Sequence, residues 1–212
     1  MSDKSKQDLT KPIAWLAALH VVVLVGLWQP ATQDIFVRLI PLNFVAALGF
    51  VLYYQKHWNI RIIAFCLFVF AVTFAVEVAG VQSGRIFGVY KFGKTLGPKL
   101  WNVPIVMGVF WLLLVYCVGV MLKSIKYHTL LKAAIGAAML VMLDVLMEPV
   151  AVKFGMWGFD KNRVPLMNYI AWFFVSFPLI LLFLNLKAKV RNELAPYAFV
   201  VVTGFFLVAN LF

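Results

Sequence analysis

Residues 74–93 read FAVEVAGVQSGRIFGVYKFG, an apolar run that carries one acid and gives way to glycines and aromatics. An ionised carboxylate in hydrocarbon is costly, so Glu77 is expected to face a cavity or a partner, which indicates a functional site. If the helix continues past Glu77, spacings of three and four residues place Gly80, Gly84 and Gly88 along the same stripe. Such a stripe admits a flat ligand beside the acid, or equally a closely packed helix with Glu77 bonded to a neighbour.

The composition is that of an integral membrane protein. Of the 212 residues, 64% are hydrophobic and 13% are charged, whereas a soluble domain has about 45–50% apolar and about 25% charged residues. The length suits one helical bundle without a separate soluble domain, so residues 1–212 are expected to form a single polytopic membrane domain. Residues 1–12 are polar and are expected to form an amino-terminal tail.

Seven apolar runs follow one another along the chain, most of them near the roughly twenty residues that a bilayer crossing requires. Each is expected to be a helix, because only intrahelical hydrogen bonds satisfy the backbone of a lone segment in lipid. The fold class is therefore all-α: an integral membrane bundle of about seven transmembrane helices, with a long connection rich in glycine and aromatics after the third. The expected spans are 13–28, 35–54, 60–79, 101–122, 130–152, 165–186 and 194–212.

The lysines and arginines predict the orientation. With the amino terminus inside, eleven of the 19 basic residues fall on the inner side and eight on the outer, and the inner segments are short and basic. We expect a multi-pass protein of the cell membrane with a cytoplasmic amino terminus. The two long connections, about 80–100 and 153–164, then share the outer face, where such loops are commonly functional. Part of the first is a candidate to dip back into the membrane.

Several classes of site are not supported. The net charge of +11 is spread over short loops and termini, which suits anionic lipid and gives no clustered surface for nucleic acid. Cys66 and Cys117 lie inside apolar runs as core residues. His20, His57 and His128 are scattered, so no histidine-rich metal site is expected. No Gly-rich dinucleotide motif is present, and the last span has no lysine for a retinal Schiff base. The class of function that these features still allow is proton chemistry without a cofactor, in a pocket that faces the lipid.

Three acids lie inside predicted spans, and all three fall in the outer half of the bilayer. At a rise of 1.5 Å per residue, Glu77 lies roughly 25 Å, Asp144 roughly 21 Å and Glu148 roughly 27 Å from the inner ends of their helices. Crowded carboxylates in a dry site cannot all ionise cheaply, so one is expected to keep its proton and another to act as base. The alternative is a structural network in which Arg85, Asn168 or a tyrosine satisfies them.

Polar and aromatic residues accompany the acids. Asn168 opens the sixth predicted helix on the outer side, and Trp172 follows four residues later on the same face. Asn168 is a candidate to hold a water or orient a carboxylate, or simply a helix-packing hydrogen bond. Tyr90, Trp101, Trp157 and Trp172 are candidates to stabilise a cation, although tryptophan and tyrosine are also ordinary at membrane interfaces.

With these residues in place, residues 60–180 resemble the membrane carotenoid biosynthesis proteins of bacteria and haloarchaea, whose characterised members are carotenoid 1',2'-hydratases, including the bacterioruberin-pathway hydratase. In the family pattern a glycine commonly precedes Val164, where this chain has Arg163, which bears on the pocket mouth and the exact substrate. The matching residues are Glu77, Gly80, Gly84, Phe87, Gly88, Tyr90, Leu96, Gly97, Val103, Pro104 and Trp111, then Asp144, Glu148, Pro149, Trp157, Val164, Pro165, Asn168 and Trp172.

The resemblance implies addition of water across the terminal C=C of an acyclic carotenoid end, with neither cofactor nor metal. Asp144 or Glu148 would protonate the alkene and Glu77 would activate the water, although the reverse order stays open. The substrate would be an acyclic or monocyclic carotenoid from the lipid phase, and other enzymes of carotenoid biosynthesis are possible partners. The implied substrate-binding residues are Gly80, Gly84, Arg85, Phe87, Gly88, Tyr90, Trp157, Asn168 and Trp172.

Three other functions use the same features. Intramembrane acids also form the proton relays of transporters, although this chain has no evident internal repeat. A non-catalytic carotenoid-binding or assembly protein would need the same apolar pocket. An isoprenoid isomerase or cyclase would need the same acids, and only its products would distinguish it.

Overall fold

The computed structural model describes residues 9–160 and 163–212, so the amino-terminal tail predicted for 1–12 lies largely outside the described residues. The described chain is all-helical apart from four short strands. The helices are α1 (Thr10–Trp28), α2 (Gln33–Tyr53), α3 (Ile60–Ser83), α4 (Val106–Lys123), α5 (Thr129–Lys153), α6 (Leu166–Asn185) and α7 (Ala195–Ala209). The strands are β1 (Tyr90–Phe92), β2 (Lys99–Leu100), β3 (Val103–Pro104) and β4 (Trp157–Phe159).

The predicted fold class is confirmed. Six of these helices, α1 to α6, are long and apolar enough to cross a membrane, and α7 is a shorter apolar helix of 15 residues. Two predicted starts are wrong. The first helix begins at Thr10 and so includes the last three residues of the predicted tail, and the fourth begins at Val106 because residues 101–105 belong to a hairpin.

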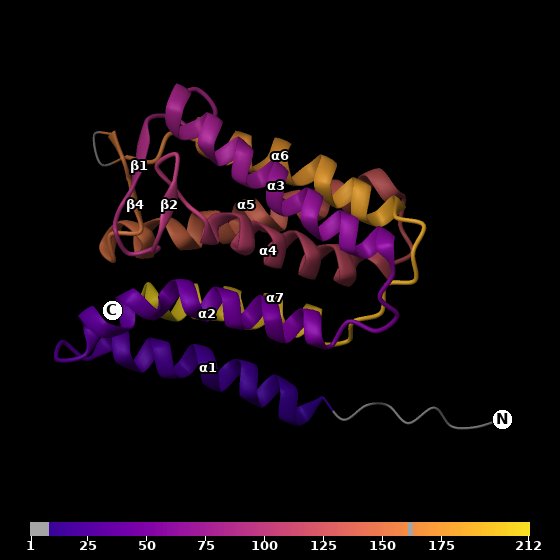
Figure 1. Ribbon diagram of the computed structural model, residues 1–212, viewed down its shortest axis with the longest axis horizontal. Coiled ribbons are helices and arrows are strands. Elements are labelled where there is room, and N and C mark those ends of the chain that lie inside the picture. The colour runs from indigo at the N-terminus through magenta and orange to yellow at the C-terminus, as the bar shows by residue number, and fades with distance from the viewer. Residues whose placement is uncertain (1–8, 161–162) are drawn as a thin grey trace.

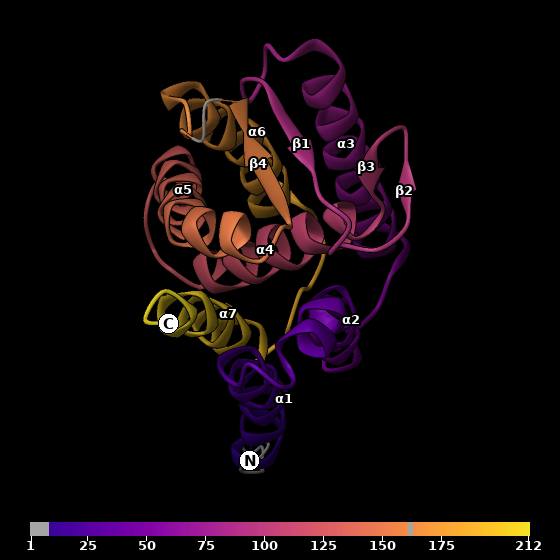
Figure 2. The same cartoon turned by 90° about the vertical axis from the view of Figure 1, so that its left-hand side faces the viewer.

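The helices alternate in direction along one common axis, and α4 lies at the centre of the bundle (Figures 1 and 2). It packs against α2, α3, α5, α6 and α7, and nearly all of its residues are buried. On one side of α4 lie α1, α2 and α7, and on the other lie α3, α5 and α6 (Figure 2). The strands sit at the end of the bundle where α3 leads toward α4 and α5 toward α6 (Figure 1).

The two long connections are joined by backbone hydrogen bonds. Strand β1 pairs antiparallel with β4, with Tyr90 opposite Phe159 and Phe92 opposite Trp157. Strands β2 and β3 form a hairpin whose turn residues, Trp101 and Asn102, both have positive φ. Both connections therefore lie at the same end of the bundle, as the alternation of helices predicts.

The predicted glycine stripe is wrong, because α3 ends at Ser83. Gly84 follows the helix in the left-handed conformation (φ 63°), which glycine adopts without strain, and its N–H bonds back to the Gly80 carbonyl. Gly88 lies farther on in the connection, also at positive φ. Only Gly80 stays on the helix, and a Cβ there would lie 2.6 Å from the Phe87 ring. The missing side chain therefore lets the connection fold back onto α3.

Candidate active site

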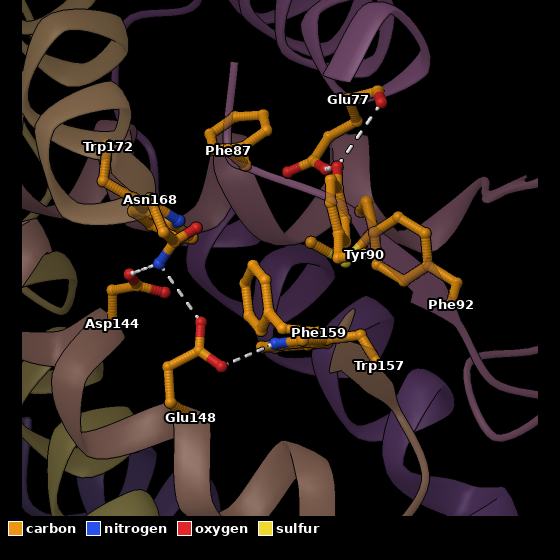
Figure 3. Close-up of a pocket in the computed structure, with 11 residues that line it drawn as sticks. Glu77, Phe87, Tyr90, Phe92, Asp144, Glu148, Trp157, Phe159, Asn168 and Trp172 are labelled. Carbon is orange, nitrogen blue, oxygen red and sulfur yellow. Dashed lines mark hydrogen bonds between the residues drawn. The ribbon is translucent and has the colours of Figure 1, made fainter. Parts of the chain in front are cut away.

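A small cavity lies between helices α3 to α6 and strands β1 and β4 (Figure 3). Its volume, taken as the space open to the centre of a water molecule, is about 20 Å³. One water needs about 10–15 Å³ on this measure, so the cavity has room for about a single water molecule. Its lining residues are Glu77, Phe87, Tyr90, Phe92, Met107, Asp144, Glu148, Trp157, Phe159, Asn168 and Trp172.

Glu77 is held on one side of this cavity by two neutral donors. The Tyr90 hydroxyl from β1 donates to its Oε2 at 2.5 Å, and the Trp111 indole N–H from α4 donates to its Oε1 at 2.8 Å. The same indole ring stacks on Trp172 of α6, with ring centroids 4.0 Å apart. Burial and the neighbouring Glu77 raise the pKa of the Tyr90 hydroxyl above its usual value, so Tyr90 remains a donor.

Asp144 and Glu148 lie across the cavity from Glu77 (Figure 3). They are one helical turn apart on α5 and therefore share a face. The side-chain amide of Asn168 on α6 bridges them, donating to Asp144 Oδ2 at 2.6 Å and to Glu148 Oε1 at 3.2 Å. The Trp157 indole N–H donates to Glu148 Oε2 at 2.9 Å. Asp144 Oδ1 is buried and has no hydrogen-bond partner among the described residues.

Aromatic rings close the cavity on the side of the strands. Tyr90 contacts the rings of Phe87, Phe92 and Phe159 at centroid distances of 5.9, 5.4 and 5.6 Å, and Phe92 meets Trp157 edge-on at 6.2 Å. These five residues, Phe87, Tyr90, Phe92, Trp157 and Phe159, are called the aromatic wall below. Because the register of β1 and β4 places alternate residues on one face, the wall combines two connections distant in sequence.

Most residues singled out in the sequence meet at this cavity. All three acids line it, together with Phe87, Tyr90, Trp157, Asn168 and Trp172. Gly80 does not line it but lies directly beneath Phe87 and Tyr90. The structural-network alternative is realised in part, because Asn168 and a tyrosine bond the acids.

Four residues lie elsewhere. Arg85 is exposed, and within the described chain no lysine, arginine or histidine forms an ion pair with the three acids. Gly84 caps α3, and Gly88 packs against Pro165. Trp101 is 62% exposed in the hairpin turn, away from the cavity.

Sequence reasoning did not assign four residues of the site. Phe92 and Phe159 lie two positions after Tyr90 and Trp157, and they share a face with them because these segments are strands, which the sequence did not predict. Met107 and Trp111 are four residues apart on α4, which gives them one helical face. A tryptophan in mid-helix is a large apolar residue with one N–H to satisfy, and that property was the available signal for Trp111.

The described chain holds no group of three or more His, Cys, Asp or Glu side chains arranged to bind a metal ion. The three acids are divided between two sides of the cavity, and each is bonded by neutral donors. The arrangement can therefore place a small reacting group between a carboxyl pair and an opposing carboxyl group.

Comparison with known proteins bears on the family to which this chain belongs. A bisanhydrobacterioruberin hydratase of Haloarcula japonica is 29% identical over 119 residues, which cover 52% of this chain and 41% of the relative. The chain thus matches less than half of that relative's length. No solved structure matches. Residues 36–212 match the family described as carotenoid biosynthesis protein. Since this match covers most of the sequence, the chain belongs to the carotenoid biosynthesis protein family.

Proposed function

We propose that the protein is a carotenoid hydratase that adds water to the terminal C=C of an acyclic carotenoid end. The observation that carries the proposal is the division of the acids, with Asp144 and Glu148 on one side of an aromatic-walled cavity and Glu77 on the other (Figure 3). Hydration of an alkene needs both an acid and a base, and opposite sides of the double bond are suitable places for them. The name of the haloarchaeal relative supports the same reaction class.

The reaction balances with these groups alone. One acid of the Asp144–Glu148 pair gives its proton to the less substituted alkene carbon, where the π electrons form the new C–H bond. The other carbon becomes a tertiary carbocation and is captured by the oxygen of water. Glu77 takes the proton that this water loses, and a tertiary alcohol results.

The aromatic wall suits the intermediate. The faces of aromatic rings attract cations, by about 2 kcal/mol or more where the site is desolvated. Tyr90 and Phe87 both line the cavity that separates Glu77 from the acid pair. Fixed groups of this kind stabilise developing charge without reorganising during the reaction.

A carotenoid end is much larger than one water, so its binding requires the aromatic wall to move. The wall is carried by two strands of three residues each and by the connections around them. The acids and Asn168, in contrast, are on long helices. The helices can thus hold the reacting groups in place while the connections adapt.

We further propose that the substrate reaches the cavity from the lipid phase of the cell membrane, and that the amino terminus is cytoplasmic. Six apolar helices of membrane-spanning length support a multi-pass protein, and the lysine and arginine distribution supports the orientation. Other enzymes of carotenoid biosynthesis are the expected neighbours.

The test is incubation of the purified full chain with an acyclic-ended carotenoid in heavy-oxygen water, followed by mass analysis. Label in a new hydroxyl group is expected. Glu77→Gln is expected to abolish the product while the protein still accumulates, whereas Glu193→Gln is the matched control, because Glu193 pairs with Arg191 outside the cavity. Pigment that is retained unchanged by wild type would contradict the hydratase and indicate a binding protein. An unlabelled isomer would indicate an isomerase or cyclase.

A further inference from the structure

The hydrogen bonds of the cavity distinguish the three acids from one another. Their carboxyl groups have six oxygens, and five of these accept a hydrogen bond from the four side chains named above. The donors in Trp111, Trp157 and Asn168 are N–H groups, which donate and do not accept in these contacts. An acid bonded by such a group must therefore present an accepting oxygen to it.

Glu77 and Glu148 each accept on both oxygens. Glu77 accepts from Tyr90 and Trp111, and Glu148 accepts from Trp157 and Asn168. In a protonated carboxyl group one oxygen is an O–H donor, and only a carboxylate is acceptor-only on both. The pattern at Glu77 and Glu148 is therefore that of two carboxylates.

Asp144 has a different pattern. Its Oδ2 accepts the 2.6 Å bond from Asn168, while its Oδ1 is buried without a partner among the described residues. Because no described side chain donates to Oδ1, a proton on this oxygen displaces no hydrogen bond, whereas a proton on either oxygen of Glu77 or Glu148 would displace one. A protonated Oδ1 is neutral and has a proton to donate, and Figure 3 shows this oxygen on the side of the carboxyl group that faces Glu148 and the cavity.

The spacing of the pair gives a second, independent reason. One amide nitrogen reaches both Asp144 and Glu148, so the two carboxyl groups lie close together in a dry site. Two ionised carboxylates so placed repel strongly, and such a pair retains one proton. Since Glu148 has a donor on each oxygen, the retained proton belongs on Asp144.

We infer that the resting pair holds its one proton on Oδ1 of Asp144, with Glu148 and Glu77 ionised. Resting on the function proposed above, Asp144 is then the acid that protonates the alkene: its O–H bond breaks and leaves its electrons on Oδ1. Glu148 and Asn168 are positioning residues that hold Asp144 in place. Transfer of the proton gained by Glu77 back to Asp144 restores the resting state.

A proton on Glu77 is the competing arrangement. Glu77 Oε2 would then donate to the Tyr90 oxygen, and the Tyr90 hydroxyl would turn to the Glu77 backbone carbonyl, which is 3.4 Å away. That contact is at the long limit for an O–H donor, whereas the present bond to Oε2 is 2.5 Å. The two arrangements predict different residues for the same spectroscopic signal.

Infrared spectroscopy of the purified full chain tests the inference directly. A protonated carboxyl group has a carbonyl stretching band that a carboxylate lacks, and this band shifts in heavy water. We expect the band in wild type and its loss in Asp144→Asn. Glu77→Gln should keep it unchanged. Glu148→Gln should keep it at a shifted frequency, because the charge beside Asp144 is gone. A band that survives Asp144→Asn and disappears in Glu77→Gln would overturn the assignment.

Asp144→Glu covers the case in which Asp144→Asn does not fold. It keeps the acid on a longer side chain, so the band should persist at a changed frequency, whereas an unchanged band would place the proton elsewhere. The outcomes also separate the two proposals. A band assigned to Asp144 without hydrated product leaves the proton assignment standing and rejects the hydratase. Labelled product together with a band assigned to another acid supports the hydratase and rejects the proton assignment.

Discussion

The indole of Trp111 has two roles in the site. Its N–H donates to Glu77, and its ring stacks on Trp172, which itself lines the cavity. A phenylalanine would keep a ring in that stack and remove the donor. The two roles can therefore be separated by one substitution.

We predict that Trp111→Phe lowers product formation by about 10- to 100-fold, which corresponds to about 1–3 kcal/mol for a buried oxygen left without its donor. The fold should persist, because the ring remains. Product yield per folded protein, measured by chromatography of extracted pigment, checks this. Trp101→Phe is the matched control, since Trp101 is exposed in the hairpin turn. Equal losses in both variants would contradict a specific role for the Trp111 N–H.

Asn168 provides the second prediction at this scale. Asn168→Asp replaces the bridging amide with a third carboxyl group beside Asp144 and Glu148, so repulsion replaces two hydrogen bonds. We expect a greater loss of thermal stability and product than in Asn168→Ala, which only removes the donors. Thermal unfolding in detergent and pigment analysis measure both quantities. An aspartate variant as stable and active as wild type would exclude a bridging role.

The sequence predicted the acids of the site better than their partners. Ionisable residues are rare in apolar spans, and helical rise alone placed Glu77, Asp144 and Glu148 in the same half of the bilayer. Of the partners that the sequence offered, Asn168 and a tyrosine bond the acids, whereas Arg85 is exposed. The indole N–H donors of Trp111 and Trp157 were not predicted. Hydropathy cannot identify such donors, because a buried tryptophan reads as an apolar residue until its neighbours are known.

At the scale of elements, two backbone segments approach each other closely just after β1, at Gly93. The Gly93 N–H donates to the Met156 carbonyl, and a Cβ on Gly93 would lie 1.9 Å from the Gly155 carbonyl oxygen. No side chain can move to relieve that contact, because the opposing atom is backbone. Gly93 thus determines how closely the two connections meet.

We predict that Gly93→Ala separates β1 from β4 and destabilises the fold by about 1–3 kcal/mol, the usual range for overpacking. Product formation should fall with it, since the aromatic wall spans both strands. Gly158→Ala is the matched control: it lies on β4, and a Cβ there meets nothing within 4 Å. Thermal unfolding of the two variants side by side makes the comparison. Similar midpoints would mean that the approach at Gly93 is not needed.

The helices were predictable as elements and the strands were not. An apolar run of about twenty residues has few alternatives in lipid, so most helix bounds were predicted within a few residues. A strand of three residues is too short to display the alternation that identifies strands. The pairing of Tyr90 with Phe159 joins segments far apart in sequence, and no local pattern encodes it. The glycine stripe failed for a local reason, because Gly84 ends the helix.

At the scale of the whole molecule, helices α1, α2 and α7 contribute no residue to the lining of the cavity. They cover the far side of α4, where a hydrogen-bonded group of Gln55, Tyr116 and Asn192 ties α2, α4 and the start of α7 together. The bundle thus has a catalytic end, as proposed, and an opposite end joined by neutral polar contacts.

The proposed orientation gives a prediction at this scale. Lys94 and Lys126 are both exposed and lie at opposite ends of the bundle, and the two native cysteines are buried. In intact cells, a membrane-impermeant thiol reagent is expected to label Lys94→Cys and to label Lys126→Cys only after permeabilisation. The unmodified protein is the control for background labelling. The reverse labelling pattern would show that the orientation is opposite to the one proposed. It would not change the arrangement of residues in the cavity.

The division between helices and connections also has a consequence for how such proteins diversify. The three acids and the Asn168 bridge lie on α3, α5 and α6, whereas the aromatic wall lies on residues 86–92 and 157–159. Chimeras that exchange only these two segments between relatives should therefore change which pigment is preferred while the bond being made stays the same.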